Sequence, residues 1–419
     1  MSLGHIEDGS LERDAAVRVI QLLRDRDHTA YLAGGCVRDM LLGYVPKDFD
    51  VATDARPEQI ETYFRKTASV GAAFGVILVR DFGATIEVAT FRSDGEYSDA
   101  RRPDSIEYST PEMDARRRDF TINALFLDPT DGIDGRVIDY VDGLHDVEKR
   151  VLRAVGDPDH RLNEDHLRAL RAVRFAARYG LEIEAATKNA IATHALELRG
   201  VSVERIGEEM RRMLVHPSRT LACELIDELG LDDAIFGDIC TFHPEMMRLL
   251  GEELSYPLAL TSLAFGRGHD IDEDPEPVCA QYRARLDLSN ADRDSMRSIW
   301  WIARSMHTDW ANMGDAGKRR IGGMPYADDA LRLYEAWCIC RNSREAAGVR
   351  SDLDKWRESE HGFCPSPFID GGDLIKIGLK PGPEFRKILD SVYDAQLENR
   401  VTTPEAALSL ARELSQGHA

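Results

Sequence analysis

Two aspartates one residue apart, Asp48 and Asp50, are the first residues in the chain whose types and spacing could do chemistry. They lie in residues 47–52, where polar and apolar residues alternate as in a β-strand. Residues two apart in a strand point to the same face, so the two carboxylates are expected to converge. Carboxylate oxygens bind hard divalent cations, but acidic pairs are also common on exposed strands. By itself the pair therefore predicts a metal site only weakly.

A glycine pair and an arginine upstream strengthen this interpretation. Gly34 and Gly35 stand where a short strand is expected to turn into a helix, and there backbone N–H groups can closely approach a phosphate. Arg38, one turn into that helix, adds a guanidinium suited to phosphate. A phosphate cradle followed about a dozen residues later by paired carboxylates favours metal-assisted nucleotidyl transfer. In such a site, two Mg²⁺ ions would bridge a nucleoside triphosphate and activate an attacking hydroxyl.

A basic run before an apolar segment supplies further candidates. Arg118 is expected at the rim of the head, where it would bind phosphate or ribose. Asp119 could accept a hydrogen bond from a ribose hydroxyl or orient Arg118, and the residue types alone leave both roles open. Glu87 stays outside the predicted catalytic set, because it could equally pair across strands with Arg92 or Arg80.

A charged helix is expected further along the chain. At 100° per residue, Asp165 and Arg168 would face the same side of one helix. The carboxylate accepts and the guanidinium donates, so together they could meet the Watson–Crick edge of a base. Arg171, Arg174 and Arg178 would form a basic stripe on the neighbouring face. Without further context, a solvated charged face explains this stripe at least as well.

The elements that must position these residues indicate the α+β class, with an α/β head built on one mixed sheet and an all-helical remainder. In the head we expect helices at residues 11–26, at 36–42 and from residue 56, strands at 29–33, 47–52, 76–79, 85–91 and 120–127, and a mobile loop at 92–111. From residue 162 onward helical periodicity continues to the C-terminus. We therefore expect an α/β head that carries the nucleotidyl-transfer residues (1–150), a helical neck that carries Asp165 and Arg168 (151–216), and a helical body and tail (217–419).

Composition sets limits on the partners. The 419 residues carry a formal net charge of −21, which excludes a uniformly basic nucleic-acid binder and requires any RNA to be held by a local basic surface. No stretch free of charged side chains exceeds 13 residues, too short for a membrane span. The first 28 residues contain no apolar signal segment, and the seven scattered cysteines are typical of idle thiols. A cytoplasmic location is therefore expected.

Together the motifs resemble those of the class II CCA-adding enzymes and bacterial poly(A) polymerases, a family of RNA nucleotidyltransferases. The similarity runs in order along the chain from residue 31 to residue 397. It rests on segments 31–39, 47–53, 87–92, 117–124, 164–175 and 204–210, and on three short segments within 372–397. Several ordered motifs are highly specific together, so chance is not an adequate explanation.

This resemblance implies template-independent, Mg²⁺-dependent addition of C and A from CTP and ATP to the 3′ end of tRNA, with a two-metal site. It implies that Asp48 and Asp50 are the catalytic metal ligands. The implied nucleotide site consists of Gly35, Arg38, Arg118, Asp119, Asp165, Arg168, Arg171 and Arg174. Within it, Asp165 and Arg168 would read the base. The resemblance also implies a catalytic nucleotidyltransferase head, a neck that recognises the base, and a body and tail that bind RNA. Neither DNA nor a membrane is expected as a partner.

Several alternatives stay open. A poly(A) polymerase, which extends RNA 3′ ends with AMP, would share every one of these motifs. Such enzymes tend to carry a basic pair before Phe74 and a histidine after it, whereas this chain has Ala72 and Ala73 and no histidine there, which favours tRNA. Split enzymes that add only CC or only A belong to the same family. A non-catalytic nucleotide-binding regulator would not need metal carboxylates, and a small-molecule nucleotidyltransferase would not need the long helical body.

Overall fold

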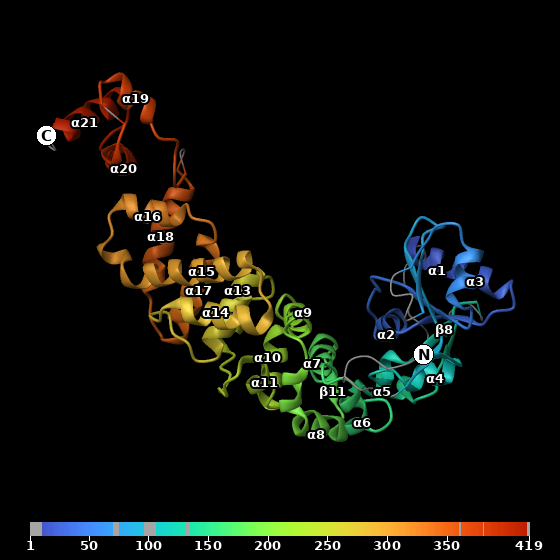
Figure 1. Cartoon of the computed structure of the whole chain (residues 1–419). Helices are drawn as coiled ribbons and strands as arrows, with labels where there is room; N and C mark the ends of the chain where they lie inside the picture. Colours follow the sequence, from blue (N-terminus) through green and yellow to red (C-terminus); the bar gives the residue numbers. More distant parts are fainter. Residues whose placement is uncertain are drawn as a thin grey trace. The chain divides into compact units, whose positions relative to one another are not determined.

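The structure is a computed structural model that describes residues 11–69, 75–95, 106–130, 135–359, 362–379 and 381–416. The chain divides into two compact units, which Figure 1 shows with colours that follow the sequence. Unit 1 comprises Met1–Met213 and Leu221–Ile239, and unit 2 comprises Leu214–Thr220 and Cys240–Ala419. The boundaries expected at residues 150 and 216 remain predictions.

A seven-stranded mixed sheet forms the framework of unit 1. Its strand order is β3-β4-β5-β2-β1-β8-β9. The central pair β2 and β5 is parallel, and the other neighbours are antiparallel. The strands are β1 (Ala30–Ala33), β2 (Asp50–Thr53), β3 (Thr67–Ser69), β4 (Val76–Val79), β5 (Ile86–Thr90), β8 (Phe126–Asp128) and β9 (Arg136–Ile138).

Helices accompany the sheet and continue beyond it in unit 1. They are α1 (Leu11–Arg24), α2 (Gly35–Leu41), α3 (Pro57–Tyr63), α4 (Pro111–Arg116), α5 (Gly143–Lys149), α6 (Pro158–Glu164), α7 (Arg168–Tyr179), α8 (Ala185–Thr193), α9 (Val203–Leu214), α10 (Arg219–Glu228) and α11 (Asp232–Phe236). Short 3-10 turns lie at η2 (Thr121–Asn123) and η3 (Ala195–Gly200). The small pairs are β6 (Arg92–Asp94) with β7 (Ile106–Tyr108), and β10 (Val151–Leu152) with β11 (Glu182–Ile183).

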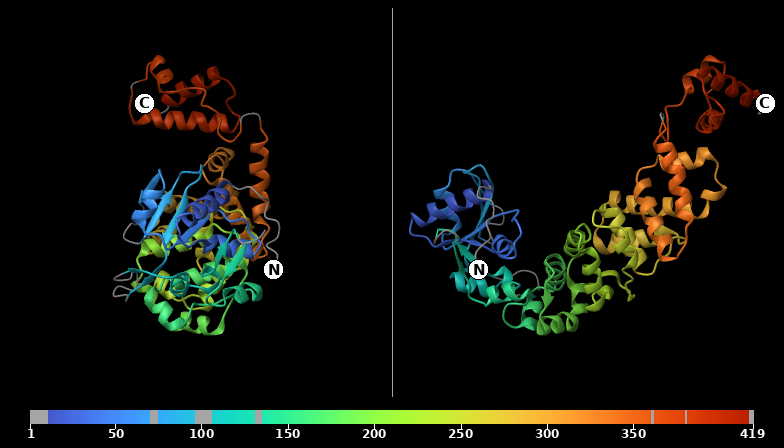
Figure 2. Two further views of the ribbon diagram at one scale, coloured as in Figure 1. Left: turned by 90° about the vertical axis from the view of Figure 1, so that its right-hand side faces the viewer. Right: turned by 180° about the vertical axis from the view of Figure 1, so that it is seen from behind.

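In unit 2, the residues that the structure describes form helices and no strand, as the yellow to red part of Figure 2 shows. The helices are α12 (Glu245–Leu249), α13 (Tyr256–Gly266), α14 (Pro275–Leu286), α15 (Asn290–Thr308), α16 (Asp315–Gly322), α17 (Ala327–Cys340), α18 (Glu345–Arg357), α19 (Gly371–Lys376), α20 (Pro383–Leu397) and α21 (Pro404–Gln416), with a 3-10 turn η4 (Trp310–Asn312). Over the described ranges, no helix is both long and apolar enough to cross a membrane. The predicted α+β class is confirmed.

Apolar spacing explains how the sheet is held. Helix α1 buries Ala16, Val19, Ile20 and Leu23, a spacing of three and four residues that places them on one face against β1, β2 and β5. The central strands bury apolar residues on both faces, as expected for a sheet interior. The strand edge that carries the candidate residues therefore rests on a fixed core.

Two predictions between residues 92 and 127 are wrong in part. The expected loop at 92–111 begins and ends in the paired strands β6 and β7, whose backbone groups satisfy each other although few side chains there are apolar. The middle of that loop, residues 96–105, lies outside the described residues. The expected strand at 120–127 contains an isolated bridge from Phe120 to Ala154, the turn η2, and only then β8.

Two predictions about the acidic motifs also need correction. Strand β2 begins at Asp50, so Asp48 precedes the strand, although it lies close enough for its charge to act on the Asp50 carboxylate. The helix expected across Asp165 is interrupted there: α6 ends at Glu164 and α7 begins at Arg168. The Asp165 carboxylate accepts a hydrogen bond from the Leu167 N–H at 3.1 Å, a local turn that competes with helix continuation.

Candidate active site

A pocket of about 600 Å³ lies within unit 1, beside β1, β2, β5 and α7. Eight of the predicted site residues line it: Gly35, Arg38, Asp50, Arg118, Asp119, Asp165, Arg168 and Arg171. Asp48 is exposed before β2, and Arg174 lies on α7; neither lines the pocket. Residues more than one hundred positions apart in the sequence thus meet in one cavity.

Two carboxylates meet at one wall of the pocket. Asp50 begins β2 and stands in register with Glu87 on the parallel strand β5, and both side chains line the cavity. Burial, together with the negative charges of Glu87 and Asp48, raises the pKa of Asp50 to about 6 against the opposing effect of Arg118. This wall therefore carries negative charge that its surroundings do not fully compensate.

The glycine turn is required by close packing. Gly34 has φ +69°, and a Cβ atom at that position would stand 2.8 Å from Nη1 of Arg118. A side chain would therefore both strain the backbone and displace the guanidinium. The turn brings β1, α2 and Arg118 together without a side chain between them.

Arg118 is oriented by a residue that sequence analysis does not identify. Asp114, at the buried face of α4, accepts hydrogen bonds from Arg118 Nη2 at 2.9 Å and from Arg117 Nη2 at 2.6 Å. Burial acts to raise the pKa of Asp114, but the two guanidinium charges outweigh it, and its pKa is below the ordinary value. The Arg118 side chain is 19% exposed, so it is fixed in place yet reaches the cavity.

A buried network connects the glycine turn to α7. Arg38 uses four of its five N–H donors on Asp39, Asn123 and Tyr179. Asn123 in turn donates to Asp119 at 3.0 Å, and Asp119 accepts two hydrogen bonds from Arg171, at 2.6 and 2.9 Å. Arg38 is thus held rigidly at the cavity, and only one of its N–H groups has no partner among the described residues and remains for a ligand.

Asp119 serves as the buried anchor of this network. Its oxygens accept hydrogen bonds from Arg171, from Asn123 and from the Phe120 N–H. Asp119 therefore orients Arg171, and not Arg118. Burial acts to raise its pKa, but the Arg171 charge and the Asn123 hydrogen bond hold the pKa far below the ordinary value. Asp119 therefore stays ionised as the counter-charge of Arg171.

Helix α7 places an aromatic ring beneath its arginines. The guanidinium groups of Arg38, Arg171 and Arg174 lie 4.9, 5.3 and 4.3 Å from the centre of the Phe175 ring. Arg174 is turned toward α9, where its Nε donates to Glu209 at 2.6 Å. The basic stripe expected from the sequence is therefore divided. Arg171 lines the cavity, whereas Arg174 connects α7 to α9.

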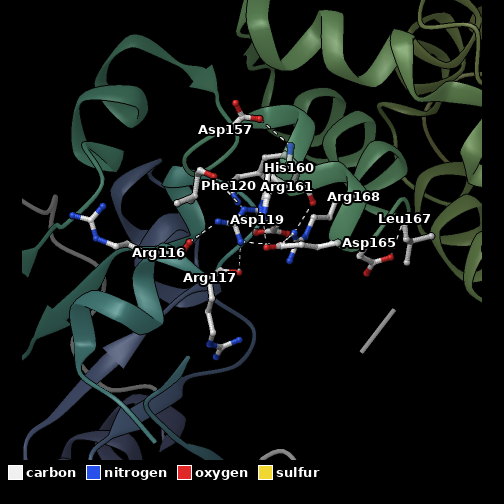
Figure 3. Close-up of polar contacts among 12 residues, drawn as sticks. Arg116, Arg117, Asp119, Phe120, Asp157, His160, Arg161, Asp165, Leu167 and Arg168 are labelled. Carbon is white, nitrogen blue, oxygen red and sulfur yellow. Dashed lines mark hydrogen bonds and ion pairs between the residues drawn. The ribbon is translucent and has the colours of Figure 1, made fainter. Parts of the chain in front are cut away.

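The pair expected to read a base lies at the break between α6 and α7 (Figure 3). Arg168 begins α7, and its Nη1 donates to the Arg161 carbonyl oxygen at 2.6 Å and to Glu164. Among the described residues, Nε and Nη2 of Arg168 have no hydrogen-bond partner, so their donors are available to a ligand. Asp165 also lines the cavity. The two side chains reach one site although they do not share a helix.

Arg161 connects this break to the segment that carries Arg118. It lies within α6 and is labelled in Figure 3. It donates to the carbonyl oxygens of Arg116 and Arg117, at 2.7 and 3.1 Å, and pairs with Glu164 at 2.9 Å. Glu164 is thereby held between Arg161 and Arg168. Arg161 therefore fixes the position of Arg168 relative to the segment that carries Arg118.

The pocket suits a divalent cation shared with a phosphate ligand. Among the described residues, no three His, Cys, Asp or Glu side chains gather closely enough to hold a metal ion by themselves. Mg²⁺, however, is usually bound by one or two carboxylates together with waters and substrate phosphates. Asp50 and Glu87, uncompensated at one wall and faced by arginines at the other, fit that arrangement.

Two known family descriptions match parts of the chain. "Poly A polymerase head domain" matches residues 30–153, which contain the glycine turn, both carboxylates and Arg118. "Probable RNA and SrmB- binding site of polymerase A" matches residues 180–243, which include α8, α9 and α10.

Curated relatives match nearly the whole chain. The CCA-adding enzyme of Lacticaseibacillus paracasei is 33% identical over 416 residues, which cover 96% of each chain. That of Lactobacillus johnsonii is 39% identical over 400 residues, which cover 94% of this chain and 96% of the relative. Among solved structures, the Bacillus stearothermophilus CCA-adding enzyme in complex with CTP has 25% identity and a TM-score of 0.77, with 98% of this chain and 99% of that one covered.

Proposed function

This chain belongs to the family of CCA-adding enzymes, and from that premise we propose that its pocket adds C and A to tRNA 3′ ends from CTP and ATP. Enzymes of this family typically need a divalent metal, and we assign Mg²⁺ to this role. The single observation that best supports the proposal is that one pocket is lined by the carboxylates of Asp50 and Glu87, by Arg38 and Arg118, and by Asp165 together with Arg168.

The reaction joins the RNA to the α-phosphorus of the nucleotide. A new bond forms between the 3′-oxygen of the RNA and the α-phosphorus, the bond to the β-phosphate oxygen breaks, and pyrophosphate leaves. Asp50, Glu87 and Asp48 would hold Mg²⁺, which supplies charge neutralisation of the triphosphate and activation of the attacking hydroxyl. Glu87 is thus added to the residues predicted from the sequence.

The arginines divide the remaining tasks. The backbone at Gly35, the one free donor of Arg38, and Arg118 bind the triphosphate and ribose. Asp165 would accept from the amino group of cytosine or adenine, and Arg168 would donate to the neighbouring ring nitrogen. Because both bases present an amino donor beside a ring acceptor, one fixed pair can select both. Asp119, Arg171 and Arg174 act as supports of this arrangement.

A primer-extension assay tests the proposed function. Purified protein with Mg²⁺ would be given tRNA transcripts that end before CCA, after C and after CC, each with CTP, ATP or both. We expect growth by CCA that then stops, and no growth of an unstructured RNA. A long A ladder on any RNA would identify a poly(A) polymerase, and addition of A only after CC would identify half of a split system. Residues 70–74, which favour tRNA in the sequence, lie outside the described residues.

Gly34→Ala is expected to reduce kcat/KM for CTP and ATP by about tenfold to 100-fold, because the added Cβ displaces Arg118 from the triphosphate. Gly43→Ala is the matched control: Gly43 also has a positive φ, +83°, but its Cβ would meet nothing within 4 Å. Steady-state kinetics and thermal unfolding of both variants check this. Equal losses of activity in the two variants would show that backbone strain, and not displacement of Arg118, causes the effect.

A further inference from the structure

Helix α9 supports the base-reading break without lining the pocket. Nη2 of Arg205, on α9, donates to Oδ2 of Asp165 at 2.6 Å, with the two side chains 22% and 15% exposed. One turn later on the same face, Glu209 is buried and pairs with Arg174. Helix α9 therefore holds α7 and the break before it through two ion pairs.

The base of this support is rigid. Ile206 and Met210, which follow Arg205 on α9, are 3% and 1% exposed and fix the helix in the core of unit 1. Asp165, in contrast, lies in neither α6 nor α7. Among the residues that the structure describes, its other oxygen is held only by the Leu167 N–H at 3.1 Å. Without Arg205, that single local bond would allow the carboxylate to rotate.

We propose that Arg205 is a positioning residue for base selection, which holds the Asp165 carboxylate in the one orientation that accepts the amino group of cytosine or adenine. This inference rests on the proposed function of Asp165 and Arg168. The Arg205 ion pair consumes one lone pair of Oδ2 and fixes the plane of the carboxylate, so the remaining lone pairs keep a constant direction. Arg205 itself does not line the pocket and so acts through Asp165.

The chemistry of the rejected bases gives the expected effect. Uracil and guanine present a carbonyl oxygen where cytosine and adenine present an amino group, so a fixed carboxylate at that point repels them. A carboxylate that can turn away removes this repulsion and leaves the Arg168 donors free to bind the carbonyl. Loss of Arg205 should therefore weaken the binding of CTP and ATP and, at the same time, strengthen the binding of UTP and GTP.

Arg205→Gln and Arg205→Lys test this on the full-length enzyme with a tRNA transcript that ends before CCA. We expect Arg205→Gln to lower the ratio of kcat/KM for CTP over UTP, and for ATP over GTP, by about 10- to 100-fold. Arg205→Lys keeps the charge but not the planar geometry, and should recover part of this ratio. Arg199→Gln is the control, because Arg199 forms an ion pair of the same 2.6 Å length with Asp233, away from the pocket.

A double-mutant cycle separates positioning from general support. In the Asp165→Ala background, Arg205→Gln should cause no further loss of discrimination. The proposal is overturned if both Arg205 variants keep the wild-type ratios, if the two losses add independently, or if Arg199→Gln lowers the ratios equally. If Arg205→Gln does not fold, Arg205→Lys decides: wild-type ratios in that variant contradict the proposal. Wild-type CCA addition in the same assay verifies the proposed function separately.

Discussion

Replacing Asp50 with Asn is expected to lower the rate of nucleotide addition by about 10³-fold while the folded protein stays at least as stable. A bound metal contributes several kcal/mol to stabilising the transition state, and each 1.36 kcal/mol corresponds to a factor of ten. Burial and neighbouring carboxylates raise the pKa of Asp50 to about 6, so its charge at neutral pH is a cost to folding that Asn removes. Single-turnover kinetics and thermal unfolding measure the two effects.

Asp25→Asn provides the matched control for this change. Asp25 is exposed just after α1 and does not line the pocket. The rate of nucleotide addition and the stability of Asp25→Asn should therefore equal those of the wild type. Full activity of Asp50→Asn would refute the assignment of the metal site. Loss of activity together with a lower unfolding temperature would show that the variant is inactive because it is less stable.

Replacing Asp119 with Ala is expected to destabilise unit 1 by about 3–5 kcal/mol, because the Arg171 guanidinium loses its near counter-charge at 2.6 Å and keeps only the weaker contact with Glu209 at 3.9 Å among the described residues. Nucleotide binding should be lost as well, since Asn123 and through it Arg38 lose their shared anchor. The variant Asp119→Ala/Arg171→Leu, which removes both charges, should recover a large part of the stability. Thermal unfolding of the three proteins checks this.

The effect of Asp119 should also depend on pH. Its pKa in the folded protein lies below the ordinary value of 3.8, so its contribution to stability is present above that pH and is lost as the pH falls further. The titration of Asp119 therefore predicts a constant difference in unfolding temperature between the wild type and Asp119→Ala from pH 5 to 8. The difference should decrease below about pH 4. A constant difference down to pH 2 would contradict the ion pair.

The sequence was sufficient for the head fold and for most of the pocket because both depend on short local patterns. The apolar residues of β1, the pairing of β4 and β5 around the turn at residues 81–83, and the proline that begins α3 are local signals that predict these elements directly. The same holds for the glycine turn, whose two glycines stand between a strand and a helix.

The supporting residues could not be predicted, because their function depends on partners far away in the chain. Asn123 looks like part of an apolar strand, yet it bridges Arg38 and Asp119 across 85 and 4 positions. Arg205 follows Asp165 by 40 positions on another helix. The break at Asp165 was missed for a related reason: a helical pattern continues through it, and only the side-chain hydrogen bond to the Leu167 N–H ends the first helix.

The central claim is that a single pocket reads both bases without a template, and competition between the two nucleotides tests it most directly. Equilibrium dialysis of labelled CTP against the full-length protein with Mg²⁺ would be repeated with increasing unlabelled ATP, UTP and GTP. We expect one CTP per chain, complete displacement by ATP, weak displacement by UTP and GTP, and loss of this preference in Asp165→Ala. Simultaneous binding of CTP and ATP to one chain would contradict the account.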